Sequence, residues 1–392
     1  MSEPAFWTGF VILLGGVAAL VARSARIPAA ALALTAGALF HQVIATTGRI
    51  NTLPLGDHGM SLVGALAAAM LGFLIGAEID PVLLIRNSRS IAVGTAAQAM
   101  AVSGAVYSAG LFLGFGRTDA LTLAVFAIAA SPVALAAVTN EERARGALTL
   151  RALPVSMLSL GIALIVRNVV SGENAPGTMS GWTALGGTLV FGCLGGLVLL
   201  FPLSRMGTRG ATIAALGAGA FMMTALSNAS GYGRGHLIVM TALAGLVMAT
   251  FSATRTLIRE TLRDLAFPCA SVAFAIEGAS LAMPPIRFLA LGCVTLVAAR
   301  CLGLWLSCAI TRGPADAIGE TAIMMPMGGM LLFLPGMALQ ADSVSDGRVA
   351  VTLIGAAFLS QVVGMPAACR ALRRAGEAAQ TDEALASWRV PT

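Results

Sequence analysis

A few polar residues interrupt long apolar stretches of this sequence, and these residues could do chemistry. Arg300 lies within CVTLVAARCLGLWLSC, and Glu277 lies within SVAFAIEGASLAM. A charge at the centre of a membrane costs about 2.5–3.5 kcal/mol on insertion scales, so such residues usually face a protein interior and have a partner. Ser156 and Ser159 are three residues apart, which places them on one face of a helix. A carboxylate can carry a proton or a cation, whereas a guanidinium keeps its charge.

Two apolar segments, 119–138 and 320–340, are interrupted near their middle by residues that break helices. The breakers are Ser131 and Pro132 in the first segment, and Pro326, Gly328 and Gly329 in the second. Proline removes a backbone donor and glycine loosens a helix, so such breaks at membrane depth occur where the backbone lines a cavity or is buried in protein. A pair of interrupted segments in corresponding halves of a chain is typical of a secondary transporter's binding site. Two ordinary kinked helices would give the same pattern.

The composition requires lipid around most of the chain. Of its 392 residues 57% are hydrophobic and 11% are charged, and the mean hydropathy is +0.88. A soluble domain of this length has about 25% charged residues. The apolar residues come in blocks of about 20, which is the length of a membrane-spanning helix, whereas the strands of a membrane barrel would alternate over about 10 residues. The sequence therefore predicts an all-α polytopic membrane protein.

Thirteen apolar segments can be distinguished. Their approximate spans are 6–23, 27–46, 60–79, 91–114, 119–138, 147–166, 183–203, 211–229, 236–253, 266–283, 287–310, 320–340 and 348–368. The interrupted segments are the fifth and the twelfth, and their odd offset makes the two halves of the chain inverted repeats with respect to the membrane. The predicted division is a first half over 1–168, a linker and the seventh helix over 169–205, a second half over 206–368 and a cytoplasmic tail over 369–392.

The distribution of arginine predicts the orientation. All 24 basic residues are arginine; seventeen lie in the odd-numbered loops and the tail, and six lie in the even-numbered loops. Because cytoplasmic loops carry the excess of basic residues, we expect the N-terminus outside and the C-terminus in the cytoplasm of a bacterial inner membrane.

Nothing in the sequence indicates an enzyme. The six cysteines form no CxxC pair and lie mostly within apolar segments, so they are interpreted as small buried side chains, and we expect no metal site and no cofactor. The arginines occur singly in loops, which argues against a nucleic-acid partner. The expected partners are the lipid bilayer and a small ion or solute.

Five motifs, in this order along the chain, carry a family resemblance. They are LGFLIGAEIDPVLLIRNSR, ASPVALAAVTNEE, HLIVMTALAGLVM, DLAFPCASVAFAIEG and MPMGGMLLFLPGMAL. Together they make the chain resemble the cation:proton antiporter family, the bacterial sodium/proton and potassium/proton exchangers, over roughly 8–368. The resemblance implies two inverted repeats of six helices, with broken helices five and twelve crossing at mid-membrane. It also implies a mobile core domain, a dimerisation domain that makes a homodimer, and alternating access.

The residues that bind ions in the family are degenerate here. The family's sixth helix bears one or two Asp, but the segment 147–166 contains no carboxylate, and Ser156 lies in the matching stretch. Arg300 stands in place of the family's Lys, and Met327-Gly328-Gly329 replaces its Arg-Gly-Glu. The N-termini of two half-helices are expected to face Arg300 and to add positive potential. A site of this kind favours an anion, or no solute at all.

Two hypotheses follow from the sequence. The first is a secondary transporter of the antiporter fold, nominally exchanging Na⁺ or K⁺ for H⁺, with altered coupling or an anionic solute. Its site residues would be Ser131, Pro132, Ser156, Ser159, Arg300, Pro326, Gly328 and Gly329, with Glu277 as a substitute proton carrier if it faces the core. The second is a non-transporting pseudo-transporter that acts as a membrane scaffold, sensor or assembly partner. A hydrated cavity that Arg300 shares with Ser131 and Ser156 favours the first, and an Arg300 sealed by pairing with backbone carbonyls or Glu277 favours the second.

Overall fold

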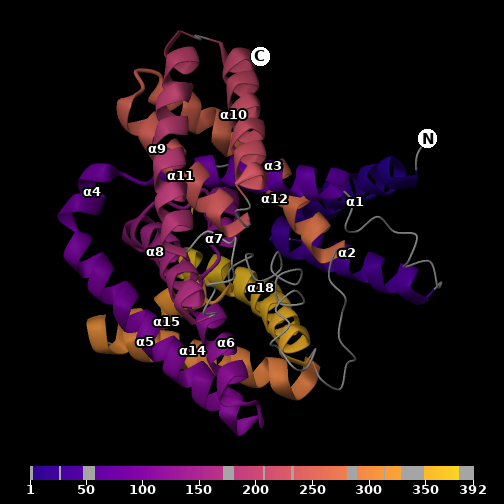
Figure 1. Ribbon diagram of the computed structural model, residues 1–392, viewed down its shortest axis with the longest axis vertical. Coiled ribbons are helices and arrows are strands. Elements are labelled where there is room, and N and C mark those ends of the chain that lie inside the picture. The colour runs from indigo at the N-terminus through magenta and orange to yellow at the C-terminus, as the bar shows by residue number, and fades with distance from the viewer. Residues whose placement is uncertain are drawn as a thin grey trace.

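The described part of the chain is helical almost throughout (Figure 1). The computed structural model describes residues 3–25, 28–46, 58–170, 181–205, 208–230, 234–279, 289–312, 314–327 and 348–378. Within these residues it contains fifteen α-helices, one π-helical turn and a single isolated β-bridge. The predicted all-α class is confirmed.

The helices follow the predicted segments closely. The first nine are α1 (Glu3–Ala25), α2 (Ala29–Thr46), α3 (His58–Glu78), α4 (Pro81–Arg86), α5 (Ser88–Phe112), α6 (Arg117–Ile128), α7 (Pro132–Glu141), α8 (Ala147–Val170) and α9 (Gly181–Arg205). The others are α10 (Arg209–Ala229), α11 (Arg234–Phe251), α12 (Arg255–Ala279), η2 (Leu289–Cys293), α14 (Val294–Arg312), α15 (Pro314–Met324) and α18 (Arg348–Arg374). Each of the thirteen predicted segments contains described helix.

Length and composition make this a multi-pass membrane protein. Among the described residues, six helices are long and apolar enough to cross a membrane, and four further apolar helices are shorter.

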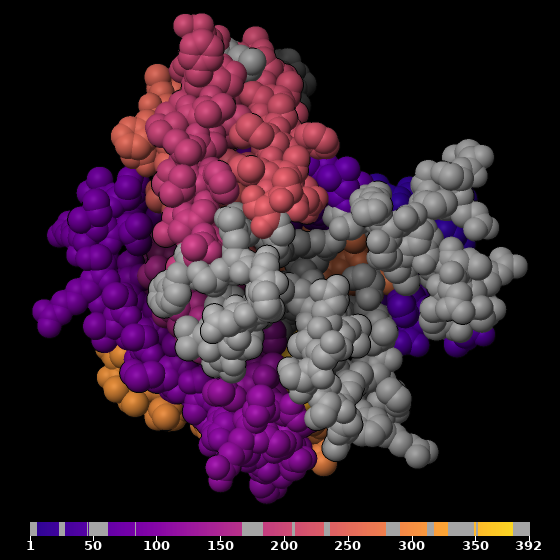
Figure 2. All heavy atoms as spheres, in the orientation of Figure 1, coloured from indigo at the N-terminus to yellow at the C-terminus, as the bar shows by residue number. Residues whose placement is uncertain are grey.

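Figures 1 and 2 place α9 and α10 at one end of the long axis and α5, α6 and α14 at the other.

The predicted boundaries of α12 and α18 are wrong for a shared reason, and α15 also begins earlier than predicted, at Pro314 rather than 320. Helix α12 begins at Arg255 rather than near 266, and α18 continues to Arg374 beyond 368. Arg255, Arg259 and Arg263 recur at helical spacing along the first half of α12, while Ile258 and Leu262 on the other side are buried. These amphipathic extensions leave the apolar block but keep the helical period, so hydropathy alone misses them.

Two helix pairs pack through glycine at very close range. In the α3–α11 pair, Gly76 lies against the carbonyl oxygen of Ala242, and Gly245 lies against that of Phe73. Gly37 and Gly278 make the equivalent contacts between α2 and α12. Because lipid tails give helices little hydrophobic reason to associate, close backbone approach through small residues is a main source of their affinity. The second pair repeats the arrangement of the first, as inverted repeats require.

Polar contacts between distant residues indicate which loops lie on the same face of the protein. They join Ala29 to Glu141, Glu78 to Arg263, Asn140 to Arg263, Glu142 to Arg373 and Arg209 to Asp264. All of these residues lie in or near the predicted odd-numbered loops or at the end of α18, so we call this side the arginine-rich face. On the opposite face His41 bonds the carbonyl of Ala279, and His236 bonds Thr188. The alternation of loops between two sides, on which the thirteen-segment topology depends, agrees with these contacts.

The end of α18 is tied to the start of α8 on the arginine-rich face. The carboxylate of Glu377 accepts hydrogen bonds from the backbone N–H of Leu148 at 2.6 Å and of Thr149 at 2.9 Å. The carbonyl of Glu377 accepts one from the N–H of Arg145 at 3.0 Å. The first N–H groups of a helix have no partner within it, and a negative charge there is favourable. Glu377 therefore serves as the N-terminal cap of α8.

Candidate functional site

The two interrupted segments meet in space. The chain leaves α6 and enters α7 through an extended stretch around Ala130, and α15 ends just before Pro326. The backbone N–H of Ser131 donates to the carbonyl of Pro326 at 2.9 Å, and Ala130 and Met327 form an antiparallel bridge. We call this meeting point the crossover. Gly328 and Gly329, two of the predicted site residues, lie outside the described residues.

Ser131 and Pro132 form the first break through ordinary helix-start chemistry. Ser131 has extended backbone geometry, and its hydroxyl accepts a hydrogen bond from the N–H of Ala134 at 3.1 Å. Pro132 follows as the first residue of α7, where the missing N–H costs nothing because no helical carbonyl would accept it. Ser131 is only 2% exposed. Both residues therefore start a half-helix at membrane depth.

Arg300 joins the two broken helices. Its side chain on α14 is 1% exposed, and its guanidinium donates from Nη1 to the carbonyl of Met324 at 3.0 Å and from Nη2 to that of Ala129 at 3.3 Å. Met324 is the last residue of α15, and Ala129 follows the last residue of α6. Both carbonyls belong to helix C-terminal ends, which carry partial negative charge. Its charge is therefore matched by two C-terminal ends, and the residues after Met327, where the second of the two expected N-termini would lie, are outside the described residues.

A serine from a neighbouring helix holds each strand of the bridge. On one side Ser159 of α8 accepts a hydrogen bond from the N–H of Ala130 at 3.2 Å. On the other side Ser360 of α18 accepts one from the N–H of Met327 at 3.0 Å, and Gln361 Nε2 donates to the carbonyl of Met327 at 3.3 Å. Sequence reasoning found Ser159 but missed Ser360 and Gln361. The predicted inverted repeat could have indicated Ser360. The last segment, which contains Ser360, is the counterpart of the sixth segment, which contains Ser159.

These two serines give the first prediction. Ser159→Ala and Ser360→Ala should each lower the melting temperature by a similar amount, because each leaves one buried N–H without a partner, at a cost of about 1–3 kcal/mol. Differential scanning fluorimetry of the purified protein in detergent measures the effect. Ser108→Ala is the matched control, since Ser108 is exposed and bonds only Gly104 of its own helix. A melting temperature for Ser360→Ala equal to that of the control would contradict the role assigned to Ser360.

The remaining predicted residues lie apart from the bridge contacts. Ser156 is fully buried, and its hydroxyl donates to the carbonyl of Leu153 in its own helix at 2.8 Å. Glu277 is 3% exposed in α12, which packs mainly against α2 and α3. Among the described residues, the hydrogen bonds that hold the crossover do not involve Glu277.

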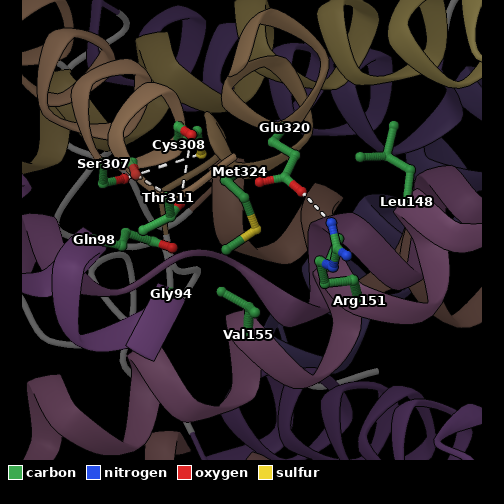
Figure 3. A pocket seen from close by; sticks show the side chains of 11 residues that line it. Gly94, Gln98, Leu148, Arg151, Val155, Ser307, Cys308, Thr311, Glu320 and Met324 are labelled. Carbon is green, nitrogen blue, oxygen red and sulfur yellow. Dashed lines mark hydrogen bonds and ion pairs between the residues drawn. The ribbon is translucent and has the colours of Figure 1, made fainter. Parts of the chain in front are cut away.

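A small cavity lies next to the crossover (Figure 3). It lies between α5, α8, α14 and α15 and has a volume of about 30 Å³. Met324, whose carbonyl bonds Arg300, lines its inner end. Within it Arg151 Nη1 and Glu320 Oε1 form an ion pair at 3.0 Å.

A wider hollow, which we call the vestibule, lies beside the cavity. This second hollow, of about 480 Å³, shares Gly94 and Thr311 with the cavity and is lined by Arg86 and Arg89. Sequence reasoning missed the ion pair of the cavity, because Glu320 is the first residue of a predicted segment and Arg151 was counted with a loop. The two partners come from different halves of the chain, and neither has a local motif that could have identified it.

Comparison with known proteins supports the fold and names the family. Two solved structures of the sodium proton antiporter MjNhaP1 from Methanocaldococcus jannaschii superimpose on the chain. The structure at pH 8 has a TM-score of 0.67 at 15% identity, covering 94% of this chain and 98% of the other. The electron-microscopy structure has a TM-score of 0.69 at 17% identity, covering 96% and 99%. At such identities they show the fold alone.

The family itself follows from the sequence match. A search of curated proteins finds no match. The family model described as "Sodium/hydrogen exchanger, transmembrane" matches residues 9–368, nearly the whole chain. With the crossed broken helices, this match establishes that the chain belongs to the sodium/hydrogen exchanger family.

Proposed function

We propose that the protein exchanges a small monovalent cation, Na⁺ or K⁺, for protons across the membrane by alternating access at the crossover. The observation that carries the proposal is the pair of broken helices that meet at Ala130 and Met327 and are bonded to one guanidinium. Interrupted helices at membrane depth are where secondary transporters build their sites. In this proposal Ser131, Pro132, Ser159, Arg300 and Pro326 shape the crossover.

The contacts of Arg300 weigh against an anionic solute. A guanidinium that attracts an anion must present charge and donors to a cavity. Arg300 instead uses two donors on the carbonyls of Met324 and Ala129 and is 1% exposed. The cavity that reaches Met324 has a volume of about 30 Å³, enough for a water molecule or a small ion but not for an organic solute.

The proposal includes an orientation and an assembly. The arginine-rich face lies in the cytoplasm because of the excess of arginine there, so the N-terminus is outside and the C-terminus inside a bacterial inner membrane. The chain forms a homodimer, as the family resemblance implies. The two inverted halves span 1–168 and 206–368, separated by 169–205 and followed by the tail 369–392.

Proton flux in liposomes tests the proposed exchange. Purified full-length protein is reconstituted with a pH-sensitive dye inside the vesicles, and inward gradients of Na⁺, K⁺ or choline are applied as chloride salts. We expect Na⁺ or K⁺ to raise the internal pH, because each entering cation is exchanged for outgoing protons, and choline to have no effect. A response to chloride or phosphate gradients in the absence of alkali cations would contradict cation exchange and restore the anionic solute.

Two observations favour the second candidate, a non-transporting scaffold, sensor or assembly partner. Helix α8 carries no carboxylate, and Arg300 is sealed against backbone carbonyls. Folded protein that moves no protons under any ion gradient would favour this candidate.

A further inference from the structure

We infer that Glu320 is the group that binds either the proton or the cation, so that the coupling carboxylate lies on the broken helix α15 rather than on α8. This inference rests on the proposed exchange function. Exchange needs one group that binds either a proton or a metal ion, and a carboxylate does both, whereas a serine hydroxyl does not titrate near neutral pH. Of the described residues that line the cavity next to the crossover, Glu320 alone carries a carboxylate.

The position of Glu320 couples it to the crossover. It lies four residues, about one helical turn, before Met324, whose carbonyl bonds Arg300. Any displacement of α15 that breaks or remakes the bond to Arg300 therefore moves Glu320 as well. In Figure 3 its carboxylate points into the cavity toward Arg151. Its side chain is 13% exposed, so an ion bound there is partly removed from water.

The wall of the cavity facing Glu320 supplies oxygen ligands and one unused polar group. Ser307 and Thr311 bring hydroxyl oxygens from α14, and Gln98 brings a side-chain amide from α5. Gln98 is 4% exposed, and its Nε2 has no hydrogen-bond partner in the described residues. A buried N–H donor left without a partner costs free energy, so it indicates a water or another acceptor beside Gln98, while the amide oxygen is the atom that could ligate a cation. Alkali cations prefer oxygen ligands, which the amide, the hydroxyls and the carboxylate provide.

In this site the guanidinium of Arg151 competes with the cation for the carboxylate of Glu320. Its side chain is 41% exposed, against 13% for Glu320, so the guanidinium can move out into solvent while the carboxylate stays. The carboxylate then takes an alkali cation, or a proton from water on the arginine-rich face. When a proton binds to Glu320, the cation is released. The proton replaces the charge of the cation, so the step needs no other reactant. Among the described residues, the other titratable and charged groups that line the cavity or the vestibule are Cys308, Arg86 and Arg89.

Cation binding and transport are measured separately to test this inference. The melting temperature of the detergent-solubilised full chain is followed at alkaline and acidic pH with added NaCl, KCl or choline chloride, because a ligand that binds the folded state raises it. We expect NaCl or KCl to stabilise the wild type at alkaline pH, and acid to weaken this effect through competition by protons. Glu320→Gln should lose the cation effect and the proton flux in liposomes.

The matched control is Glu142→Gln. Glu142 is also paired with an arginine on the arginine-rich face, at 2.6 Å, but it does not line the cavity. This variant should keep both the cation effect and the flux. Arg151→Gln should bind the cation more tightly than the wild type at alkaline pH, a gain that a purely structural ion pair would not give.

The possible outcomes distinguish failure of the assignment of Glu320 as the site from failure of the proposed exchange function. If Glu320→Gln folds and keeps cation-dependent stabilisation and flux, the site assignment is overturned while the exchange function stands. If the cation stabilises the wild type through Glu320 but no ion gradient drives protons, the site stands and the exchange function falls. If neither stabilisation nor flux is seen in the wild type, both fall. Glu320→Asp serves if Glu320→Gln does not fold, and should retain weakened cation binding.

Discussion

Arg300→Met is expected to lower the melting temperature more than any other single substitution at the crossover. Methionine fills much of the space but donates no hydrogen bonds, so the carbonyls of Met324 and Ala129 lose their partner together. Each buried carbonyl left unpaired costs about 1–3 kcal/mol. The two half-helix ends would also lose the positive charge that balances their dipoles. Differential scanning fluorimetry in detergent and in lipid nanodiscs measures the loss.

Two comparisons make the Arg300 prediction specific. Arg300→Lys should give an intermediate loss, because an ammonium is a point charge that cannot span two carbonyls as the planar guanidinium does. Arg370→Met is the control, since Arg370 is exposed on α18. A melting temperature for Arg300→Met close to that of Arg370→Met would mean that the two bonds do not hold the crossover together.

Gly76→Leu is expected to prevent α3 and α11 from packing. A side chain at Gly76 would overlap the carbonyl of Ala242, which is backbone and cannot rotate away. Overpacking a core costs about 1–3 kcal/mol even where side chains can adjust, and here a helix itself would have to shift. We expect little monodisperse protein on size-exclusion chromatography, and the same for Gly278→Leu in the α2–α12 pair.

Gly104→Leu is the control for this substitution. Gly104 lies in a membrane helix of similar length, but a side chain there would meet no atom within 4 Å. It should therefore be recovered as well as the wild type. Equal recovery of Gly76→Leu and Gly104→Leu would contradict the close packing of α3 and α11.

The sequence predicted those features that depend on local chemistry. Ser131 and Pro132 are a capping residue and a helix-starting residue in the middle of an apolar segment, so the break at the crossover could be located before the structure was known. The burial of Arg300 followed from the high cost of a charge in lipid. The identity of its partners did not follow, because backbone carbonyls occur at every residue and leave no mark in the sequence.

Features that depend on long-range contacts could not be predicted. Arg151 and Glu320 are 169 residues apart, and their pairing needs the two inverted halves to be assembled. The same holds for Ser360 and Gln361, which resemble ordinary polar residues of a membrane helix until the second break is placed beside them. The early start of α12 was missed because a charged amphipathic turn has the period of a helix but not the hydropathy of a membrane segment.

The cap that Glu377 provides has a consequence for synthesis. Leu148 and its cap are 229 residues apart. Until translation has passed the end of α18 and reached Glu377, the first amides of α8 can bond only to water or to other groups on the arginine-rich face. A truncated chain that stops before Glu377 would therefore leave a defect in its first half, far from the cut.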